Sequence, residues 1–571
     1  MVKQYPLNEV RKIRDLKDML AQSMELYPQK NLFLVKKKHG EPYEGITFAT
    51  FNQNVRELGT AFLSMGLGEK KIAVIGENRY EWAVTYLAVM NGTSMIVPMD
   101  KELPAEDICN LLKMADASAI VYSGKLASVM ERMREELPGM EYWINMDLEA
   151  DTDTEKSFCA LLDLGKSMLD GGDDTFDKVE IDPEQARVLL FTSGTTSFPK
   201  GVLLCHKNIV TNLMDMCSMT YIDEKDIFLS VLPLHHTYEC TCGFLCEVYR
   251  GSTIAYCEGL KHILPNMKEA QATMMLGVPA LFETMYKRVW AAAKKNGIDG
   301  KLRTGMKLSN ALRCIGIDLR RKIFAKVHEN FGGHMRLLVC GAAAVDPEVS
   351  KGFRDMGIAF LQGYGITECS PIVALNRDRC FKDEAAGLPL PTLAVEILDK
   401  DDEGIGEIVC KGDNVMLGYY NNEEATAEAF EGGWFHTGDL GYIDAQGFVH
   451  ITGRKKNVIV TKNGKNIFPE ELETLLNRDP NVLESLVVGE FNPEDGETYL
   501  CAQMVPNYDY IRENEGKDVS DDRIREMMES VVRVVNERNP LYKYIRRVEV
   551  RETEFVKTTT KKIKRYVVNK K

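Results

Sequence analysis

The fold class is decided by the stretch KIAVIGENRYEWAVTYLAVMNGTSMIVPMD, residues 71–100. Apolar residues run without a break in IAVI, recur at helical spacing from Trp82 to Met90, and run without a break again in MIVP. This pattern predicts a strand, a helix and a second strand. Similar alternation returns at 334–345 and 357–365. Strands that are apolar throughout are typical of parallel sheets covered by helices on both faces, so we predict an α/β fold.

The length of the chain predicts more than one domain, because 571 residues exceed what a single hydrophobic core supports. Between residues 403 and 454, short apolar runs are separated by glycine turns, which indicates a small β-rich subdomain at about 385–455. We place a boundary near Lys456. The large N-terminal domain, 1–455, is then built of mostly parallel sheets flanked by helices, and a smaller α+β domain occupies 456–571.

Composition and charge exclude several classes of function. A net charge of −14 repels phosphate backbones, so we expect no nucleic-acid partner. No run approaches the roughly 20 apolar residues that a membrane span needs, and the first 20 residues are too charged for a signal peptide. The 14 cysteines fit reduced thiols in the cytoplasm, and we expect Cys240, Cys242 and Cys246 to be buried thiols, not metal ligands.

A phosphate-binding loop is predicted by VLLFTSGTTSFPKGV, residues 188–202. An apolar strand ends at Phe191, and hydroxyl side chains, glycines and Lys200 follow. Small donors and glycines let backbone N–H groups surround an anion. The loop is not a Walker A loop, because Lys200 precedes Gly201 and no Ser or Thr follows. The alternative is a surface turn rich in Ser and Thr.

Within this loop, FTSGTTSFPKGV resembles the signature of the adenylate-forming enzymes, which include acyl-CoA synthetases, firefly-type luciferases and peptide-synthetase adenylation domains. The resemblance implies that the loop grips the β- and γ-phosphates of ATP and releases pyrophosphate. It assigns this role to Thr192, Ser193, Gly194, Thr195, Thr196 and Lys200.

Two further segments resemble the nucleotide site of the same family, namely CGAAAV at 340–345 and LQGYGITECSP at 361–371. The resemblance implies that Tyr364 lies against the adenine, that Thr367 binds the α-phosphate and that Glu368 holds Mg²⁺, a cation that prefers carboxylate oxygen. It adds the nucleotide-binding positions Gly341, Ala342, Ala343, Gln362, Gly363 and Gly365. In isolation, both segments could equally be tight turns after strands.

The ribose and thiol positions of the family match WFHTGDLG at 434–441 and the longer stretch 453–473. By this resemblance Asp439 accepts hydrogen bonds from the ribose hydroxyls, and Arg454 also reaches the ribose. Lys456 falls at the family's hinge, and Gly464 falls where a loop lines the tunnel for the thiol of coenzyme A. The resemblance therefore implies a mobile C-terminal domain.

The catalytic lysine of the family matches FVKTTTKKIKR, residues 555–565, less closely. Aligning the Lys-Ile pair places it at Lys562. Val556 stands where the family has proline and Lys561 where it has glycine, so Lys561 remains a second candidate. A basic tail is the alternative interpretation.

On the acyl side, His236 in LPLHHTYECTCGFL, residues 232–245, matches the position that borders the acid. It could act catalytically, form a wall or gate, or pack with His235.

The segment 276–290 looks most like the long-chain fatty acyl-CoA synthetase branch, and its apolar spacing also fits plain helix core. The segment 301–327 mixes basic and apolar residues, which fits either a solvated helix or peripheral membrane contact.

The resemblance implies an ATP-dependent acyl-CoA synthetase that requires Mg²⁺ and coenzyme A. It would join a medium- or long-chain fatty acid to AMP with release of pyrophosphate, and then transfer the acyl group to coenzyme A. The carboxylate substrate is already ionised, so the first step needs positive charge and alignment but no general base. The alternatives are an acyl-carrier-protein synthetase, another carboxylate-adenylating enzyme, or a non-catalytic nucleotide-binding protein. The chain could be a monomer or a homodimer.

Overall fold

The structure, a computed structural model, describes residues 5–192, 199–461, 465–492, 497–516, 519–557 and 563–565. Contacts divide the chain into two compact units. The first unit contains Met1–Ala394, Cys410–Phe435 and Gln446–Phe448, and the second contains Val395–Val409, His436–Ala445 and Val449–Lys571. The domain boundary predicted near Lys456 stays a prediction.

The predicted strand, helix and strand at 71–100 are confirmed as β3 (Lys71–Ile75), α3 (Tyr80–Met90) and β4 (Met95–Met99), with β3 and β4 paired in parallel. They belong to an eight-stranded sheet in the order β19-β9-β8-β4-β3-β5-β6-β7, parallel from β8 to β7. Its other strands are β5 (Ala119–Tyr122), β6 (Tyr142–Asn145), β7 (Lys156–Ser157), β8 (Ala186–Thr192), β9 (Lys200–Cys205) and β19 (Gly418–Tyr419).

Helices cover both faces of this sheet, as the continuous apolar strands predict. Ala73 and Ile75 point to one face and join a core cluster with α4 (Ala105–Ala115) and α5 (Ala127–Met133). Ile72 and Val74 point to the other face and are equally buried. The other helices of this part are α3, α1 (Leu16–Leu26), α2 (Phe48–Ser64) and α6 (Phe158–Asp170), and they pack on one another.

A nine-stranded sheet forms the rest of the first unit, in the order β16-β15-β14-β13-β12-β10-β11-β1-β2. Its strands are β1 (Asn31–Val35), β2 (Glu44–Thr47), β10 (Ile227–Ser230), β11 (Thr253–Tyr256), β12 (Met274–Gly277), β13 (Leu337–Cys340), β14 (Ala359–Gly365), β15 (Ile372–Leu375) and β16 (Leu388–Pro389). Six neighbouring strands of this sheet run parallel, namely β14, β13, β12, β10, β11 and β1. The edge strands β2, β15 and β16 pair antiparallel. One core cluster joins this sheet to α10 (Ile263–Glu269), α11 (Pro279–Lys295), α14 (Ala325–Asn330) and α15 (Pro347–Asp355).

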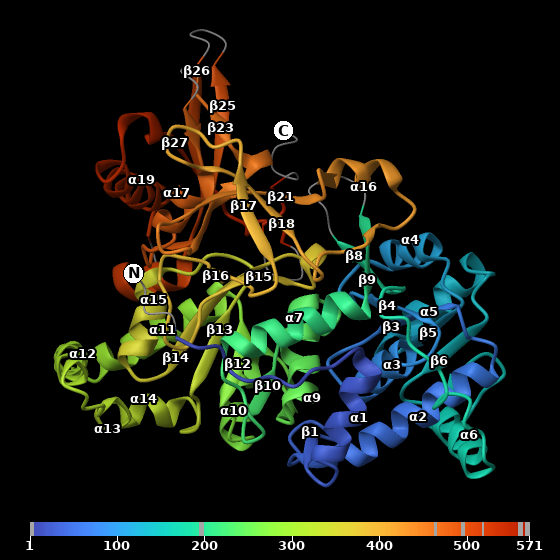
Figure 1. Ribbon diagram of the computed structural model, residues 1–571. Coiled ribbons are helices and arrows are strands. Elements are labelled where there is room, and N and C mark those ends of the chain that lie inside the picture. Colours follow the sequence, from blue (N-terminus) through green and yellow to red (C-terminus); the bar gives the residue numbers. More distant parts are fainter. Residues whose placement is uncertain are drawn as a thin grey trace. The chain divides into compact units, whose positions relative to one another are not determined.

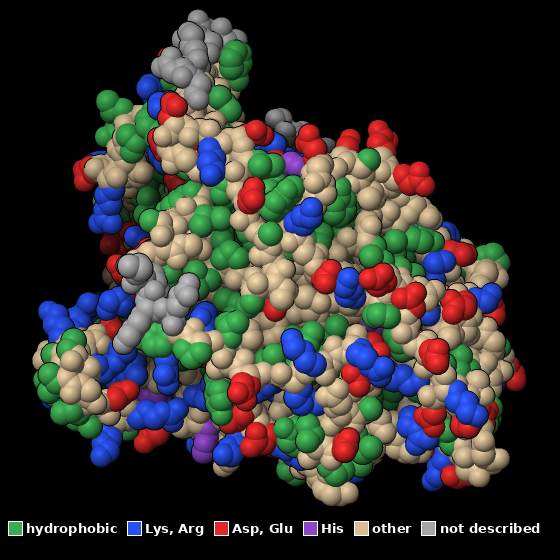
Figure 2. Space-filling view, in the orientation of Figure 1, with side chains coloured by type: hydrophobic (Ala, Val, Ile, Leu, Met, Phe, Trp, Pro, Cys, Tyr) green, Lys and Arg blue, Asp and Glu red, His purple; other side chains and the backbone are tan. Residues whose placement is uncertain are grey.

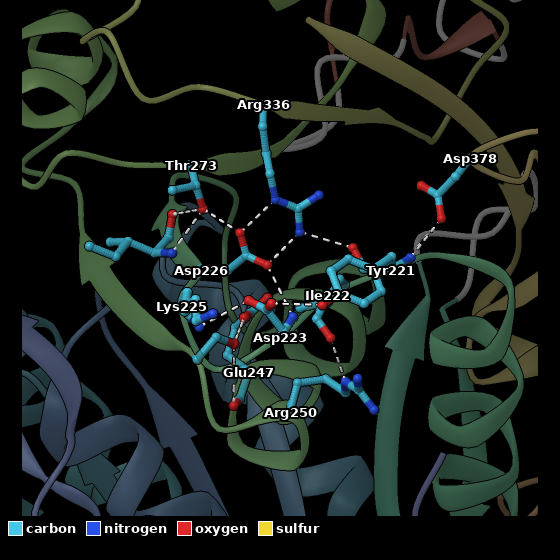
Figure 3. Close-up of polar contacts among 12 residues, drawn as sticks. Tyr221, Ile222, Asp223, Lys225, Asp226, Glu247, Arg250, Thr273, Arg336 and Asp378 are labelled. Carbon is cyan, nitrogen blue, oxygen red and sulfur yellow. Dashed lines mark hydrogen bonds and ion pairs between the residues drawn. The ribbon is translucent and has the colours of Figure 1, made fainter. Parts of the chain in front are cut away.

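An ion pair with a buried carboxylate ties together three neighbouring strands of this sheet just before their first residues (Figure 3). Asp226, Thr273 and Arg336 stand directly before β10, β12 and β13. Arg336 donates from Nε to Oδ1 of Asp226 at 2.7 Å, and the hydroxyl of Thr273 donates to the same oxygen at 2.7 Å. Burial acts to raise the pKa of Asp226, but the hydrogen bond and charge of Arg336 outweigh it and hold that pKa below its ordinary value.

One helix, α7 (His206–Met219), lies between the two large sheets and contacts both β9 and β15 (Figure 1). Most of its residues are buried, including the polar residues Asn208, Asn212 and Asp215. The chain then passes through α8 (Thr237–Glu239), a π-helical turn and α9 (Cys246–Arg250). Cys240, Cys242 and Cys246 are buried thiols, as predicted.

The β-rich part is a five-stranded sheet, which confirms the predicted subdomain. Its strands are β17 (Ala394–Leu398), β18 (Gly406–Lys411), β20 (Phe430–Glu431), β21 (Trp434–Ile443) and β22 (Val449–Arg454), and α16 (Glu423–Ala429) precedes β20. The C-terminal residues form the predicted α+β fold. Its elements are β23 (Ile459–Val460), β24 (Asn466–Ile467), α17 (Pro469–Leu476), β25 (Val482–Asn492), β26 (Glu497–Pro506), α18 (Tyr508–Glu515), α19 (Asp521–Glu537) and β27 (Ile545–Val550).

Apolar side chains of α17 and α19 pack against β25 and β26 to form the core of this C-terminal fold. In the described part of the chain, no helix combines the length and the apolar character that a membrane crossing requires.

Replacing Arg336 with methionine should destabilise the first unit by about 2–4 kcal/mol, because Asp226 would stay buried without its cation. All four tryptophans, Trp82, Trp143, Trp290 and Trp434, lie in this unit, so their fluorescence during urea unfolding reports on it. The full decrease in the free energy of unfolding should be seen at neutral pH, and the decrease should become smaller in acid. The reason is that a carboxylate with a lowered folded-state pKa contributes stability only above its titration range.

Arg56→Met is the matched control, because the Arg56–Asp177 pair is about one-third exposed at both ends and should be worth less than about 1 kcal/mol. Equal losses in the two variants would contradict a special role for the buried pair.

Candidate active site

The predicted phosphate loop joins β8 to β9, which are antiparallel neighbours. Thr192 and Lys200 face each other where the loop begins and ends, and the Thr192 hydroxyl donates to the carbonyl of Lys200 at 3.3 Å. Ser193, Gly194, Thr195 and Thr196 lie outside the described residues. The strand pair therefore fixes both ends of the predicted loop, and Thr192 and Lys200 are the predicted phosphate contacts whose positions are defined.

Gly201 is needed for packing, which the sequence does not indicate. A Cβ atom at this position would lie 2.8 Å from Cδ1 of Leu189 and 3.2 Å from Cβ of Tyr420. The absent side chain lets β19 pair closely with β9, where Tyr419 faces Val202.

Tyr419 connects Lys200 to Glu368, the predicted Mg²⁺ ligand. The Lys200 ammonium lies over the Tyr419 ring, 4.6 Å from its centre, and the Tyr419 hydroxyl donates to Oε1 of Glu368 at 3.0 Å. Two predicted site residues from different sheets thus contact one tyrosine. The sequence analysis missed Tyr419, because only the tertiary pairing of β19 with β9 brings it there.

The turn that carries Thr367 and Glu368 follows β14 as a short 3-10 helix, Thr367–Cys369. Two buried asparagines hold it. Asn212 on α7 and Asn414 each donate from Nδ2 to the carbonyls of Cys369 and Ile372, at 2.9 to 3.1 Å. Both asparagines were missed as well, although a polar residue in an otherwise buried helix is a sequence signal that could have flagged Asn212.

The two predicted adenine-side segments follow adjacent parallel strands, β13 and β14. Loops at the carboxyl ends of neighbouring parallel strands lie side by side, which is the usual place for a ligand in such sheets. Ala342 has φ +73°, a conformation rarely used by residues other than glycine. The absence of a side chain at Gly341 makes room for Tyr238, whose Cζ atom would lie 2.8 Å from an added Cβ.

Gln362 is bonded within the protein at both ends of its amide. Its Oε1 accepts from the Val345 N–H at 3.1 Å, and its Nε2 donates to the Ala385 carbonyl at 3.1 Å. The side chain therefore braces the 341–345 loop. The nucleotide contacts expected of Gln362, Gly363, Tyr364 and Gly365 stay predictions, and Gly363, Tyr364 and Gly365 pair with β15.

The histidines His235 and His236 lie with ring centres 4.2 Å apart, in the segment between β10 and α8. Burial lowers the pKa of His235 well below its ordinary value, so this ring is neutral at pH 7. His235 and the apolar side chains of Tyr86, Leu190 and Leu204 line a narrow pocket. His236 begins α8, and its predicted role at the acid stays a prediction.

A buried carboxyl group supports the histidine loop. Ser230 donates to Oε1 of Glu239 at 2.6 Å, and Asn78 donates to the Ser230 hydroxyl at 2.9 Å and to the Leu232 carbonyl at 2.7 Å. Burial raises the pKa of Glu239 to about 8, so it is mostly protonated at neutral pH. This network sets the position from which the two histidines project.

Within the second unit, the predicted ribose residues Asp439 and Arg454 are partners in the pairing of β21 with β22. Arg454 Nε lies 2.6 Å from Oδ1 of Asp439, whose side chain is only 5% exposed. Lys455 donates to the neighbouring carboxylate of Glu407 at 2.8 Å. The predicted thiol-tunnel residue Gly464 and the lysines Lys561 and Lys562 lie outside the described residues.

Comparison with known proteins decides the family. Residues 20–420 match the family model described as AMP-binding enzyme. The chain belongs to this family of adenylate-forming enzymes.

Relatives and solved structures agree with this membership. A protein named long-chain-fatty-acid–CoA ligase FadD15, from Mycobacterium bovis, is 29% identical over 466 residues, which cover 78% of this chain and 76% of the relative. The crystal structure of the anthranilate CoA ligase AuaEII with anthranoyl-AMP has a TM-score of 0.78 at 18% identity, covering 98% of this chain and 97% of that one. ATP-bound MatB from Rhodopseudomonas palustris has a TM-score of 0.74 at 21% identity, covering 97% and 98% of the two chains. The two structures share the α/β fold of this AMP-binding enzyme.

Removing the Tyr419 hydroxyl with Tyr419→Phe should lower the rate of adenylate formation by about tenfold and raise the Mg²⁺ concentration needed for half-maximal rate. A hydrogen bond to a charged group contributes about 1.5–3 kcal/mol, and its loss frees Glu368 to rotate. Tyr420→Phe is the matched control, because the ring of Tyr420 lies near Lys71 and away from Glu368. Equal effects of the two substitutions on the Mg²⁺ dependence would contradict the role given to Tyr419.

Proposed function

We propose that this chain is an ATP-dependent acyl-CoA ligase that activates a medium- or long-chain fatty acid. It forms an acyl adenylate with release of pyrophosphate, and then transfers the acyl group to the thiol of coenzyme A with release of AMP. The observation that carries the proposal is the junction at Tyr419, where one tyrosine contacts both the phosphate-loop lysine Lys200 and the carboxylate of Glu368 within an AMP-binding enzyme.

The general activity, adenylation of an acid followed by transfer to coenzyme A, has the broadest support. The chain is an adenylating acyl-CoA ligase, since the family model spans residues 20–420 and the curated relatives that match most of the chain are named as CoA ligases. The fatty acid is the finer part. It is supported by the long-chain names of those relatives.

The first step joins two anions, so the site must supply positive charge and hold the reactants in line. Lys200 brings a cation to the phosphate loop, and Thr367 brings a hydroxyl beside Glu368. A single carboxylate suits Mg²⁺, which binds proteins through one or two carboxylates together with substrate phosphates and water. The bound ion would neutralise phosphate charge. Among the described residues no cluster of three or more His, Cys, Asp or Glu side chains could hold a metal by itself.

We place the catalytic lysine at Lys562, as the sequence pattern suggests, and the hinge between the two half-reactions at Lys456. The described neighbour Arg565 forms an ion pair with Glu473 and a longer one with Glu470 at 3.6 Å, so the chain just after Lys562 is tied to α17. This anchor supports the idea that the lysine segment moves together with the C-terminal fold.

The proposal is tested by measuring activity over straight-chain carboxylic acids of increasing length, with ATP, Mg²⁺ and coenzyme A. Acid-dependent exchange of pyrophosphate into ATP should occur, and kcat/KM should rise by about fourfold for each added methylene until the acyl chain outgrows its binding site, since each buried methylene contributes about 0.8 kcal/mol. A best substrate that is aromatic or dicarboxylic would overturn the fatty-acid assignment. Absence of exchange with every acid would overturn the ligase.

Lys562→Ala should lower pyrophosphate exchange by about 100- to 1,000-fold, the usual effect of removing one group that stabilises transition-state charge. Conversion of supplied acyl adenylate and coenzyme A to thioester should survive, because that step does not need this cation. Lys561→Ala is the control and should leave exchange nearly intact. The reverse result would move the catalytic role to Lys561.

A further inference from the structure

The end of the first unit formed by α12 (Asp299–Cys314) and α13 (Arg320–Ile323) exposes an unusual amount of apolar side chain. Of the 23 large hydrophobic side chains exposed in the described part of the chain, five lie within 298–323, namely Ile298, Leu308, Ile315, Ile317 and Ile323. Leu308 is 55% exposed and Ile315 is 71% exposed. Gathered apolar side chains of this kind mark a surface that binds something.

The exposed apolar residues of α12 form a stripe that the fold itself does not use. Leu308 and Ala311 in the helix and Ile315 directly after it follow one another at spacings of three and four, so they share one face, and all three are exposed. The polar residues Lys301 and Thr304 continue this face toward the start of the helix and are also exposed. The other face holds Leu302 and Met306, which pack on the core of the nine-stranded sheet. The outer stripe is therefore free to contact a partner.

Positive charge surrounds this stripe. Residues 294–326 contain ten Lys and Arg against two acidic residues, Asp299 and Asp318, which is a net charge of +8 in a chain whose total is −14. Lys301, Lys307, Arg313 and Lys322 form no ion pair with any described residue. Figure 2 shows basic and hydrophobic side chains side by side over the α12 end of the molecule.

We propose that α12 and the loop after it, residues 299–323, form a docking surface for a bilayer rich in anionic phospholipids. Leu308, Ile315 and Ile317 enter the boundary between head groups and acyl chains, while the unpaired lysines and arginines contact lipid phosphates. This surface lies outside the site described above, and its assignment does not rest on the proposed function. It would bring the enzyme to the phase in which fatty acids concentrate.

A second copy of the chain fits this surface less well. A two-fold interface places the same patch on both partners, so the cations around Leu308 and Ile315 would face identical cations. Nucleic acid fits less well too, because a phosphate backbone would engage the lysines and leave the isoleucines exposed to water. A bilayer with anionic head groups satisfies both the charge and the apolar stripe.

The test is co-sedimentation of the full chain with vesicles of phosphatidylcholine alone and of phosphatidylcholine containing about one-third phosphatidylglycerol, the latter modelling an anionic leaflet. We expect binding to the anionic vesicles that weakens as salt is raised, and much weaker binding to phosphatidylcholine. Equal binding to both vesicles, or no binding to either at low salt, would overturn the proposal.

Two sets of variants locate the surface. Lys301→Gln, Lys307→Gln and Lys322→Gln together should lower anionic-vesicle binding by about 100-fold, since each cation near a membrane contributes about fivefold. Leu308→Glu with Ile315→Glu should abolish it. The matched controls lie on and near α1, α5 and α6, and should bind like the parent chain. They are the triple variant Lys125→Gln, Lys166→Gln and Lys178→Gln, and the double variant Leu26→Glu and Leu164→Glu.

Each variant should keep the parent's thermal unfolding midpoint, which separates lost binding from lost folding. Loss of binding in the control variants would overturn the location on α12. A parent dimer, detected by sedimentation velocity, that Leu308→Glu and Ile315→Glu convert to monomer would assign the surface to a second copy and overturn the membrane proposal.

Discussion

A row of buried polar side chains on α7 is the constraint on which the site of the first unit depends. Asn208, Asn212 and Asp215 share one face of the helix, because they are four and three residues apart. Asn208 donates to the carbonyls of Asp413 and Val415, Asn212 to those of Cys369 and Ile372, and Asp215 accepts from the Thr392 N–H and hydroxyl. Irregular backbone cannot be buried without such partners, so α7 fixes the segments that carry Glu368 and lead to Tyr419.

With its backbone fixed in this way, the site can hold opposite charges near each other without letting them cancel. Lys200 and Glu368 are not within ion-pair distance, and Tyr419 stands between them, with its ring under the ammonium and its hydroxyl on the carboxylate. If Lys200 binds phosphate as we propose, a direct pair would have to be broken each time a phosphate entered, at a cost that grows as water is excluded. Separating the two charges with a tyrosine would keep the cation available for phosphate and the carboxylate available for the proposed metal.

The sequence predicts much of this fold because its information is local. Continuous apolar runs such as 71–75 and 95–99 predict buried parallel strands, and glycine-broken runs predict the β-rich sheet. Family motifs point to Lys200, Thr367 and Glu368 for the same reason, as each motif is one short segment. Tyr419 and Asn414 escaped prediction because their roles arise from contacts between segments about 50 to 200 residues apart. Gln362 shows a different limit of motif-based prediction. Its place in the motif does not reveal that its amide bonds the Val345 N–H and the Ala385 carbonyl and so supports the 341–345 loop.

The same reasoning bears on the second unit, where Asp439 and Arg454 already form a close ion pair. A carboxylate that is only 5% exposed needs a partner for its charge, and Arg454 is one such partner across the β21–β22 pairing. The guanidinium lies on Oδ1 and leaves the remaining acceptor positions of the carboxylate in a fixed orientation. Ribose hydroxyls are donors and need such acceptors. If Asp439 binds a ribose as the sequence predicts, the ion pair would prepare it by holding its orientation, and the two residues would act as one recognition element although only Asp439 has the acceptor atoms.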